Sequence, residues 1–460
     1  MEEGTGRSAA PERSFRWWMA AACAVGLGLR LVYALVVKAG ADVGKGDAFY
    51  YHAQAQLNLD GHWFVDPVVF LVKHPVAAMI PSAQHPPLFT LLLTAADVVR
   101  LQSTGAQLAL ICLLGTATVA LTGLVVKDLV TPRAGVIAAV IAALYPGFWV
   151  FDGEIMSEAL VMLLAALTIL AANRCFRRFT TGRMVVLGLL TGLCALTRAE
   201  LVLLIPLVAV PTVLWQRSLA FPRRIALCGL VVAVAVAPML PWFARNIAVF
   251  HHPVYLSDQL PDTLAAANNF RTYSGPLTAS WCYICLLSAP FPTRDDETDR
   301  GIYWQKKAEQ YIKAHKVRAL EVAVDRVGLE WGLYAPLRVA DQNFIEGWPT
   351  PVSDAWLFWY YPLMALAVGG AVILRRRRRP IYPLMAMFIV ATVTAALTYG
   401  NERFRCEAEV AMVVLAAVSL DAIWSSLAGR PRPPRGAAHR RLAPGDEQAI
   451  PAPTPREVAV

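Results

Sequence analysis

The stretch GDAFYYH, residues 46–52, places an acid, three aromatic side chains and a histidine shortly after the first long apolar segment, 17–38. A helix needs about 20 mainly apolar residues to cross a bilayer, and 17–38 is long enough. The residues Ala39-Gly40-Ala41 resemble a signal-peptide cleavage site, but the apolar region exceeds a signal core and contains Arg30. We therefore interpret 17–38 as an uncleaved membrane helix, with residues 46–52 at the outer face of the membrane.

The composition indicates an integral membrane protein. Of 460 residues, 57% are hydrophobic and 16% are charged, against about 25% charged residues in soluble domains. The formal charge of +9 could suggest a nucleic-acid partner. However, the basic residues fall in short clusters between apolar runs, as the positive-inside rule requires, and this excludes nucleic acid as the explanation.

The apolar segments predict an all-α polytopic membrane protein with about ten spans. They are 17–38, 105–126, 134–150, 155–173, 184–197, 199–216, 225–243, 354–374, 380–399 and 406–427. A further apolar stretch, 86–101, is placed along the outer surface or as a shallow re-entrant helix. If it crossed the bilayer, the later basic clusters would lie outside.

This topology divides the chain into five parts. Residues 1–16 and 428–460 are expected to be disordered cytoplasmic tails. Residues 17–243 form an N-terminal transmembrane module, with an outer loop at 39–104 that carries juxtamembrane helices. A large extracytoplasmic loop, 244–353, precedes the C-terminal helices at 354–427.

Acids and arginines recur at the outer ends of separate predicted spans. Charges at bilayer depth cost about 2.5–3.5 kcal/mol on insertion scales, so they usually pair or line cavities. The pattern predicts one shared polar cavity at the outer leaflet, although interfacial charges can also simply mark helix ends. The residues are Asp152, Glu154 and Glu158 near one turn, Arg198 and Glu200 at a second, and Glu402, Arg403 and Arg405 at a third.

Asp47 has two interpretations. Acidic residues often cap helix starts, and 47–59 could be an amphipathic helix with Asp47 as its cap. Asp47 could instead be a catalytic carboxylate that faces the cavity. His85 stands before Pro86-Pro87, a pair typical of a helix start, so its side chain is expected at the positive end of that helix.

Three further features leave alternatives open. His52, His74 and His85 could bind a divalent metal with nearby acids, but their spacing matches no fixed motif, so no metal ligand is assigned. Arg403 and Arg405 oppose the positive-inside trend, which suggests a phosphate ligand or outer-leaflet headgroups. Cys282 and Cys285 form either a structural disulfide or two unlinked thiols.

These motifs together resemble the polyprenyl-phosphate-dependent glycosyltransferases of the C-type fold. The nearest branch holds the lipid A aminoarabinose transferases, the protein O-mannosyltransferases and many actinobacterial members. The resemblance covers about residues 17–427. It rests on GDAFYY at 46–51, HPPL at 85–88, SE at 157–158, LTRAE at 196–200, WGLYAP at 331–336 and NERFR at 401–405.

The resemblance implies roles for individual residues. Asp47 corresponds to the catalytic acid of the first outer loop, and Asp152, Glu154 or Glu158 supplies a second carboxylate. The basic residues that line the lipid-phosphate site correspond to Arg198, Arg403 and Arg405. Further substrate-binding candidates are Tyr50, His52, His85 and Glu200. The family usually has a proline where this chain has Ala199.

The predicted function is transfer of a hexosyl or pentosyl group from a polyprenyl-phosphate donor to an extracytoplasmic hydroxyl, with inversion. The acceptor is a lipid, glycan or protein, and the enzyme is expected in the plasma membrane with its site facing outward. One alternative is a lipid or glycolipid transporter or flippase, which would favour inverted repeats and broken helices. Another is a scaffold whose outer loop binds a partner.

Overall fold

The fold is built from helices. The computed structural model describes residues 6–39, 46–72, 79–287, 297–338, 343 and 347–429. Within those ranges the chain has no β-strand, and an isolated bridge joins Val65 and Pro81. The predicted all-α class is therefore confirmed.

Six helical segments of the described chain are long and apolar enough to span a bilayer. A seventh candidate is a bent unit in which α6 (Pro132–Leu144) meets α7 (Pro146–Trp149) and η2 (Val150–Gly153) at 74°. The protein is therefore a multi-pass membrane protein. The six are α1 (Gly6–Val32) with η1 (Tyr33–Val37), α5 (Thr104–Leu129), α8 (Glu158–Arg177), α11 (Phe221–Val236) with η5 (Ala237–Met239) and α12 (Leu240–Val249), α19 (Thr350–Arg376), and η6 (Glu402–Arg405) with α21 (Cys406–Leu427).

Shorter apolar helices complete the membrane part. They are α4 (Pro87–Val98), α9 (Thr181–Thr197), the run η3 (Ala199–Leu203), η4 (Ile205–Ala209) and α10 (Val210–Leu214), and α20 (Tyr382–Leu397). Each of the ten predicted spans coincides with one of the six long segments, with the bent unit or with one of these shorter helices. Only the six long segments pass the criteria of length and hydropathy by themselves, so the count of ten spans stays a prediction. The helix α1 begins at Gly6, inside the range expected as a tail, and the C-terminal tail from 430 lies outside the described residues.

The helix α4 is too short to cross the bilayer. Its 12 residues extend about 18 Å, against a hydrocarbon core of about 30 Å. It packs on α2 (Gly46–Leu59) and α9, with Phe89 and Leu93 fully buried. This agrees with the placement of 86–101 as a non-spanning segment.

Small residues allow the spans to approach closely. At the crossing of α5 and α6, a Cβ added to Gly135 would lie 2.6 Å from the Gly123 carbonyl oxygen. In lipid, helices associate through such close packing because the hydrocarbon gives little hydrophobic driving force. Any larger side chain at Gly135 would push α5 and α6 apart.

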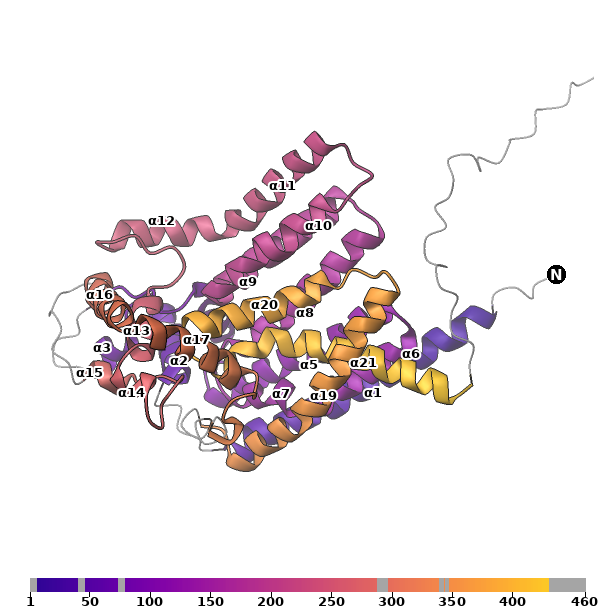
Figure 1. Cartoon of the computed structure of the whole chain (residues 1–460), viewed down its shortest axis with the longest axis horizontal. Coiled ribbons are helices and arrows are strands. Elements are labelled where there is room, and N and C mark those ends of the chain that lie inside the picture. Colours follow the sequence, from indigo (N-terminus) through magenta and orange to yellow (C-terminus); the bar gives the residue numbers. More distant parts are fainter. Residues whose placement is uncertain are drawn as a thin grey trace, which may run out of the picture.

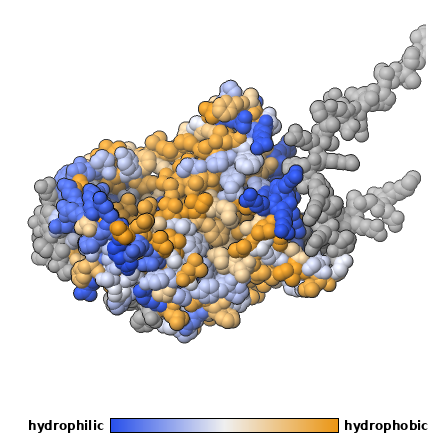
Figure 2. Space-filling model, viewed as in Figure 1, coloured by the Kyte–Doolittle hydropathy of each residue, from blue (hydrophilic) through white to orange (hydrophobic). Residues whose placement is uncertain are grey.

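The two ends of the molecule differ in charge and in the segments that form them. The α8–α9, α10–α11 and α19–α20 connections lie at one end together with the start of α1 (Figure 1). These connections carry the basic clusters, including Arg375–Arg379 as a run of five arginines. An apolar band separates this end from the hydrophilic opposite end (Figure 2).

The opposite end holds α2 and the loop helices. These are α3 (Pro67–Val72), α13 (Gln259–Ala267), α14 (Phe270–Tyr273), α15 (Ile284–Leu287), α16 (Glu297–Ala314) and α17 (Lys316–Glu330). A disulfide joins Cys282 to Cys285 beside α15, which decides between the two alternatives left open by the sequence. The loop helices cover the end of the bundle at which the polar residues gather.

Candidate active site

Asp47 lies in the first turn of α2, at the wall of a cavity of about 530 Å³. Its Oδ2 accepts a hydrogen bond from Arg403 Nη2 at 2.6 Å, and its Oδ1 lies 3.6 Å from His85 Nε2. The two partners come from η6 and from the residue preceding Pro86-Pro87 and α4, respectively. Since 23% of the Asp47 side chain remains exposed, the carboxylate is accessible from the cavity.

A second carboxylate organises the arginines behind Asp47. Glu158, the first residue of α8, is fully buried, and its Oε1 accepts hydrogen bonds from Arg403 Nε and, at 3.3 Å, from Arg198 Nη1. Arg198 also pairs with Glu200 through Nε, at 2.7 Å. Glu158 therefore fixes the orientation of two guanidinium groups that both line the cavity.

Aromatic rings pack against His85 and Arg198, two members of this network. The His85 imidazole stacks on Tyr51 with ring centroids 4.6 Å apart. The Arg198 guanidinium lies over the Phe404 ring at 5.0 Å, a cation–π distance. These contacts fix the planes of the His85 and Arg198 side chains relative to Asp47.

Two opposing effects act on the Asp47 carboxyl. Burial raises its pKa, but the charge of Arg403 and the nearby His85 imidazole outweigh burial, so the pKa lies well below its usual range. Asp47 is consequently ionised throughout the physiological range. In this arrangement it is also a weak base, because a low pKa means low proton affinity.

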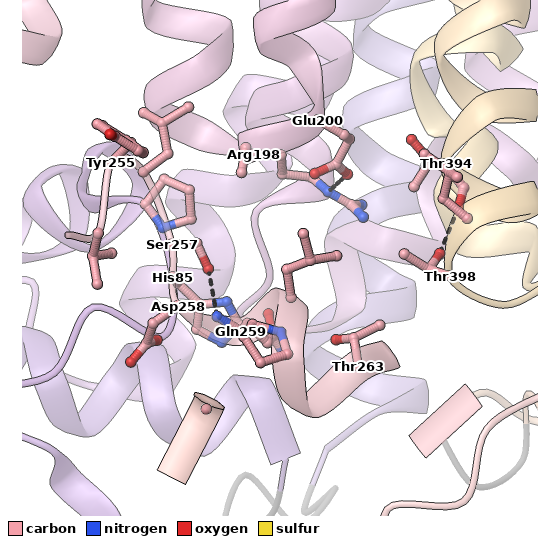
Figure 3. Close-up of a pocket in the computed structure, with 18 of the residues that line it drawn as sticks. His85, Arg198, Glu200, Tyr255, Ser257, Asp258, Gln259, Thr263, Thr394 and Thr398 are labelled. Atoms are coloured by element: carbon pink, nitrogen blue, oxygen red, sulfur yellow. Dashed lines mark hydrogen bonds and ion pairs between the residues drawn. The ribbon is translucent and has the colours of Figure 1, made fainter. Parts of the chain in front are cut away.

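The cavity has two different walls (Figure 3). Thr394 and Thr398 of the α20 side lie across the cavity from Tyr255 and Ser257 of the outer loop, with Arg198 and Glu200 between them. The α20 side also contributes Val393 and Leu397, so this wall combines aliphatic side chains with threonine hydroxyls. The outer-loop wall is richer in neutral polar groups, and it includes Ser257, Gln259, Thr263, Thr298 and Gln305.

Two predicted acids lie in separate ion pairs instead of at this cavity. Asp152 accepts a hydrogen bond from Arg30 Nε at 2.6 Å, and both side chains are almost completely buried. Glu154 pairs with Lys38 Nζ at 2.9 Å, and Lys38 also bonds the Gly347 carbonyl. Of the three acids proposed as second carboxylates, the structure brings Glu158 alone into the Asp47 network.

Arg405 also lies apart from the cavity. Its fully buried guanidinium donates to Glu409 Oε1 at 2.7 Å and lies 3.9 Å from the centroid of the Tyr360 ring. It also donates to the Glu330 carbonyl at 2.6 Å. These contacts make Arg405 a packing residue between α21, α19 and α17.

Tyr50 and His52 face away from the cavity. The Tyr50 hydroxyl bonds Ser82 Oγ within the protein. His52 bonds the Gln107 side chain at 2.8 Å and Gln56 at 3.1 Å. Tyr51 lies between Tyr50 and His52 on α2, and its side chain lines the cavity.

The described residues do not suit a metal ion. No group of three or more His, Cys, Asp or Glu side chains in the described ranges is arranged to hold one. Arg403, which pairs with Asp47 at 2.6 Å, would repel a cation from this carboxylate. His74, one of the three candidate histidines, lies outside the described residues.

Sequence reasoning missed the outer-loop wall. Ser257 sits in an irregular segment and Gln259 is the first residue of α13, and neither stands in a hydrophobic period that would have pointed to it. The α20 wall did carry a signal, because Thr394 and Thr398 are one helical turn apart in an otherwise apolar segment. Such a polar stripe indicates a face that turns toward a cavity.

The arrangement of the helices is that of the C-type glycosyltransferases. The archaeal oligosaccharyltransferase AglB from Archaeoglobus fulgidus, solved with an inhibitory peptide and a dolichol-phosphate, is 16% identical with a TM-score of 0.51. The alignment covers 90% of this chain and 51% of that chain. The apo form of the Archaeoglobus oligosaccharyltransferase aligns equally well, with 16% identity, a TM-score of 0.51 and coverage of 91% and 53%. This chain therefore spans about half the length of those proteins.

Sequence comparison adds a family match. Residues 84–242 match the family described as dolichyl-phosphate-mannose-protein mannosyltransferase. ArnT from Cupriavidus metallidurans, solved with undecaprenyl phosphate, has a TM-score of 0.38 and 14% identity over 90% of this chain and 79% of that one. No curated protein matches the sequence. The predicted resemblance to C-type glycosyltransferases is thus confirmed.

Proposed function

We propose that this protein is a membrane glycosyltransferase that moves a sugar from a polyprenyl-phosphate donor to the hydroxyl of an acceptor. The observation that carries the proposal is a carboxylate, Asp47, set at a cavity wall beside the guanidinium of Arg403. A base and a cation at this spacing match the two charges that develop when a hydroxyl displaces a phosphate. The C-type fold and the matched family support the same chemistry.

The chemical step needs one base and one anion site. The acceptor oxygen attacks the anomeric carbon as its proton passes to Asp47. The bond from that carbon to the phosphate oxygen breaks, and the polyprenyl phosphate leaves with the electron pair, held by Arg403 and Arg198. Because one displacement takes place on the face opposite the leaving group, the anomeric configuration inverts.

Donor binding would also activate the base. In the free protein Arg403 lowers the pKa of Asp47 and makes the carboxylate a poor proton acceptor. The donor phosphate is a diester with one negative charge, and its two unesterified oxygens can bind a guanidinium in bidentate fashion. When the donor phosphate engages Arg403, the Asp47–Arg403 pair weakens and the proton affinity of Asp47 rises, so the base gains strength only when the donor is present.

The site is placed at the outer face of the plasma membrane in this proposal. Basic connections gather at the opposite end of the bundle, as expected for the cytoplasmic side. The Cys282–Cys285 disulfide supports the same orientation, because disulfides persist in oxidising compartments. The α20 wall, with Val393 and Leu397, would face the lipid chain, and the outer-loop wall would face the acceptor.

Asp47→Asn tests the proposal. Asparagine caps a helix about as well as aspartate, so the variant should fold and reach the membrane normally. With purified protein, labelled polyprenyl-phosphate sugars and an envelope extract as acceptor source, transfer should fall by roughly 10²–10⁴-fold. Asp60→Asn, at the exposed end of the same helix, is the matched control and should keep full transfer. Near-normal transfer by Asp47→Asn would remove Asp47 from the base role.

The same assay distinguishes the alternative activities. A flippase would move the intact glycolipid across reconstituted vesicles without any new glycosidic bond. A scaffold would do neither. Wild-type protein that translocates donor but forms no product with any acceptor fraction would overturn the transferase proposal.

A further inference from the structure

The short segment 82–84, which leads into His85, is held from several directions. Arg245 Nη1 of α12 donates to the Ser82 carbonyl at 3.0 Å. The backbone amide of Asp258 donates to the Ala83 carbonyl at 3.1 Å, and Ser257 Oγ donates to the Gln84 carbonyl at 2.5 Å. The outer loop therefore fixes the backbone of the segment that sets the position of His85.

Glu297 completes this attachment. It is the first residue of α16, only 7% of its surface is exposed, and its Oε2 accepts a hydrogen bond from the Ala83 amide at 3.1 Å. Its carboxyl group also faces the side chains of Asp258 and Ser82. A single buried carboxyl thus touches both the loop residue Asp258 and the backbone that carries His85.

Two buried carboxyl groups that face each other are stable when they share one proton. Two ionised carboxylates would repel each other, so one of the pair must be neutral. Burial raises the pKa of Glu297, and the negative charges of Asp258 and Asp66 raise it further. Arg245 and Arg300 are the cations that face this cluster, and Tyr50 and Asp262 complete its titratable surroundings.

We propose that Glu297, as a neutral carboxylic acid, is a positioning residue that fastens the outer loop to the segment 82–85. The neutral acid donates its proton to Asp258 while its other oxygen accepts the Ala83 amide. Through His85, whose Nε2 lies 3.6 Å from Asp47, the attachment holds the orientation of the Asp47 carboxylate. The attachment itself is independent of the enzyme's activity, whereas its catalytic consequence rests on the proposed transferase function.

The sign of the pH dependence follows from the raised pKa. Below that pKa the acid is neutral and both hydrogen bonds form. As the pH rises through it, Glu297 ionises beside Asp258 and Asp66, the like charges repel, and the attachment weakens.

Hydrogen–deuterium exchange of the purified full chain tests the attachment directly. In Glu297→Ala, the amides of peptides covering 82–86 should exchange at least about tenfold faster than in wild type at pH 7. Glu297→Gln keeps an acceptor for Ala83 and a permanent donor for Asp258, so it should retain wild-type protection. Glu309→Ala, an exposed acid on the same helix, is the control and should change nothing.

Exchange measurements at increasing pH distinguish an attachment that depends on the Glu297 proton from simple packing. After correction for intrinsic exchange, wild-type protection of 82–86 should fall as the pH rises above 7, and that of Glu297→Gln should stay level. Unchanged protection in Glu297→Ala, or the same alkaline loss in Glu297→Gln as in wild type, would overturn the proposal. The Gln comparison decides the matter even if the Ala variant does not fold.

Turnover then tests the catalytic consequence. Glu297→Ala should lower kcat with donor KM nearly unchanged, and Glu297→Gln should remove an alkaline fall in wild-type kcat. Faster exchange at 82–86 with unchanged kcat would refute the positioning role. A wild-type protein without transferase activity but with the expected exchange pattern would instead refute the proposed function alone.

Discussion

Arg403 pairs with two acidic side chains of the site. Its guanidinium bonds Asp47 through Nη2 and Glu158 through Nε, so a single cation satisfies one accessible and one fully buried carboxylate. Glu158 would be an uncompensated buried charge without its two arginines, a costly arrangement in a low-dielectric interior. Arg403 therefore has both a structural partner and a partner that a substrate phosphate could replace.

Arg403→Gln should change the pH profile of the proposed transfer. Loss of the guanidinium removes a cause of the low pKa of Asp47, so that pKa rises toward its ordinary range. Because the base must be ionised, the acid limb of kcat/KM should move to higher pH, and donor KM should rise. Steady-state kinetics from pH 4 to 8 would check both effects, and an acid limb at its wild-type position would contradict the assignment of Asp47 as the titrating base.

Arg405→Ala should act on stability. Its buried guanidinium is bound to Glu409 and packed on Tyr360, and breaking a buried pair costs about 3–5 kcal/mol. We expect a lower unfolding temperature and less protein in the membrane, while any folded fraction keeps its donor KM. A raised donor KM at unchanged thermal stability would instead place Arg405 at the phosphate.

At the scale of elements, the positions of helix ends predicted which charged residues would gather at the cavity. Asp47, His85, Glu158, Arg198 and Arg403 all stand at or beside a helix terminus on one side of the bundle, and the sequence reveals termini through apolar length. Tertiary partners are not visible in this way. Asp152 and Glu154 shared the same pattern, but Arg30 and Lys38 of the first span and its flank bind them elsewhere, and no local signal encodes such pairings.

The outer end of α20 should contact the lipid chain of the donor. Leu397 lines the cavity and is 62% exposed, so Leu397→Trp would narrow the passage along this helix. Donor KM should rise several-fold for a long polyprenyl chain and less for a short-chain analogue. Ile389→Trp, eight residues earlier and about 12 Å away along the helix, is also on an exposed face and should have little effect. Equal effects of the two substitutions would argue against a lipid passage at Leu397.

At the scale of the whole molecule, charge and hydropathy are segregated along one direction. Basic connections lie at one end, the apolar band follows, and the cavity with its loop helices lies at the other end. The positions of the apolar runs and basic clusters along the sequence predicted this order. The path of the large outer loop could not be predicted, because its fold depends on contacts such as those of Glu297.

Reporter fusions should confirm the orientation. A periplasm-active reporter after Gln102, in the connection between α4 and α5, should be active, because α4 does not span. A fusion after Asp128, at the far end of α5, should be active only with a cytoplasmic reporter. If the Gln102 fusion reports the cytoplasm, the cavity would open on the opposite side from the one proposed.

Arg30 lies within the first span, and its charge is matched by Asp152, which is 122 residues further along the chain. A lone arginine near the middle of a helix disfavours membrane insertion by about 2.5–3.5 kcal/mol. At roughly 5–20 residues per second, the ribosome needs roughly 6–24 s to deliver the compensating carboxylate. During that interval α1 must remain at the lateral exit of the insertion machinery or find a temporary partner. Helix α1 therefore settles fully into lipid only after α5 and α6 have followed it.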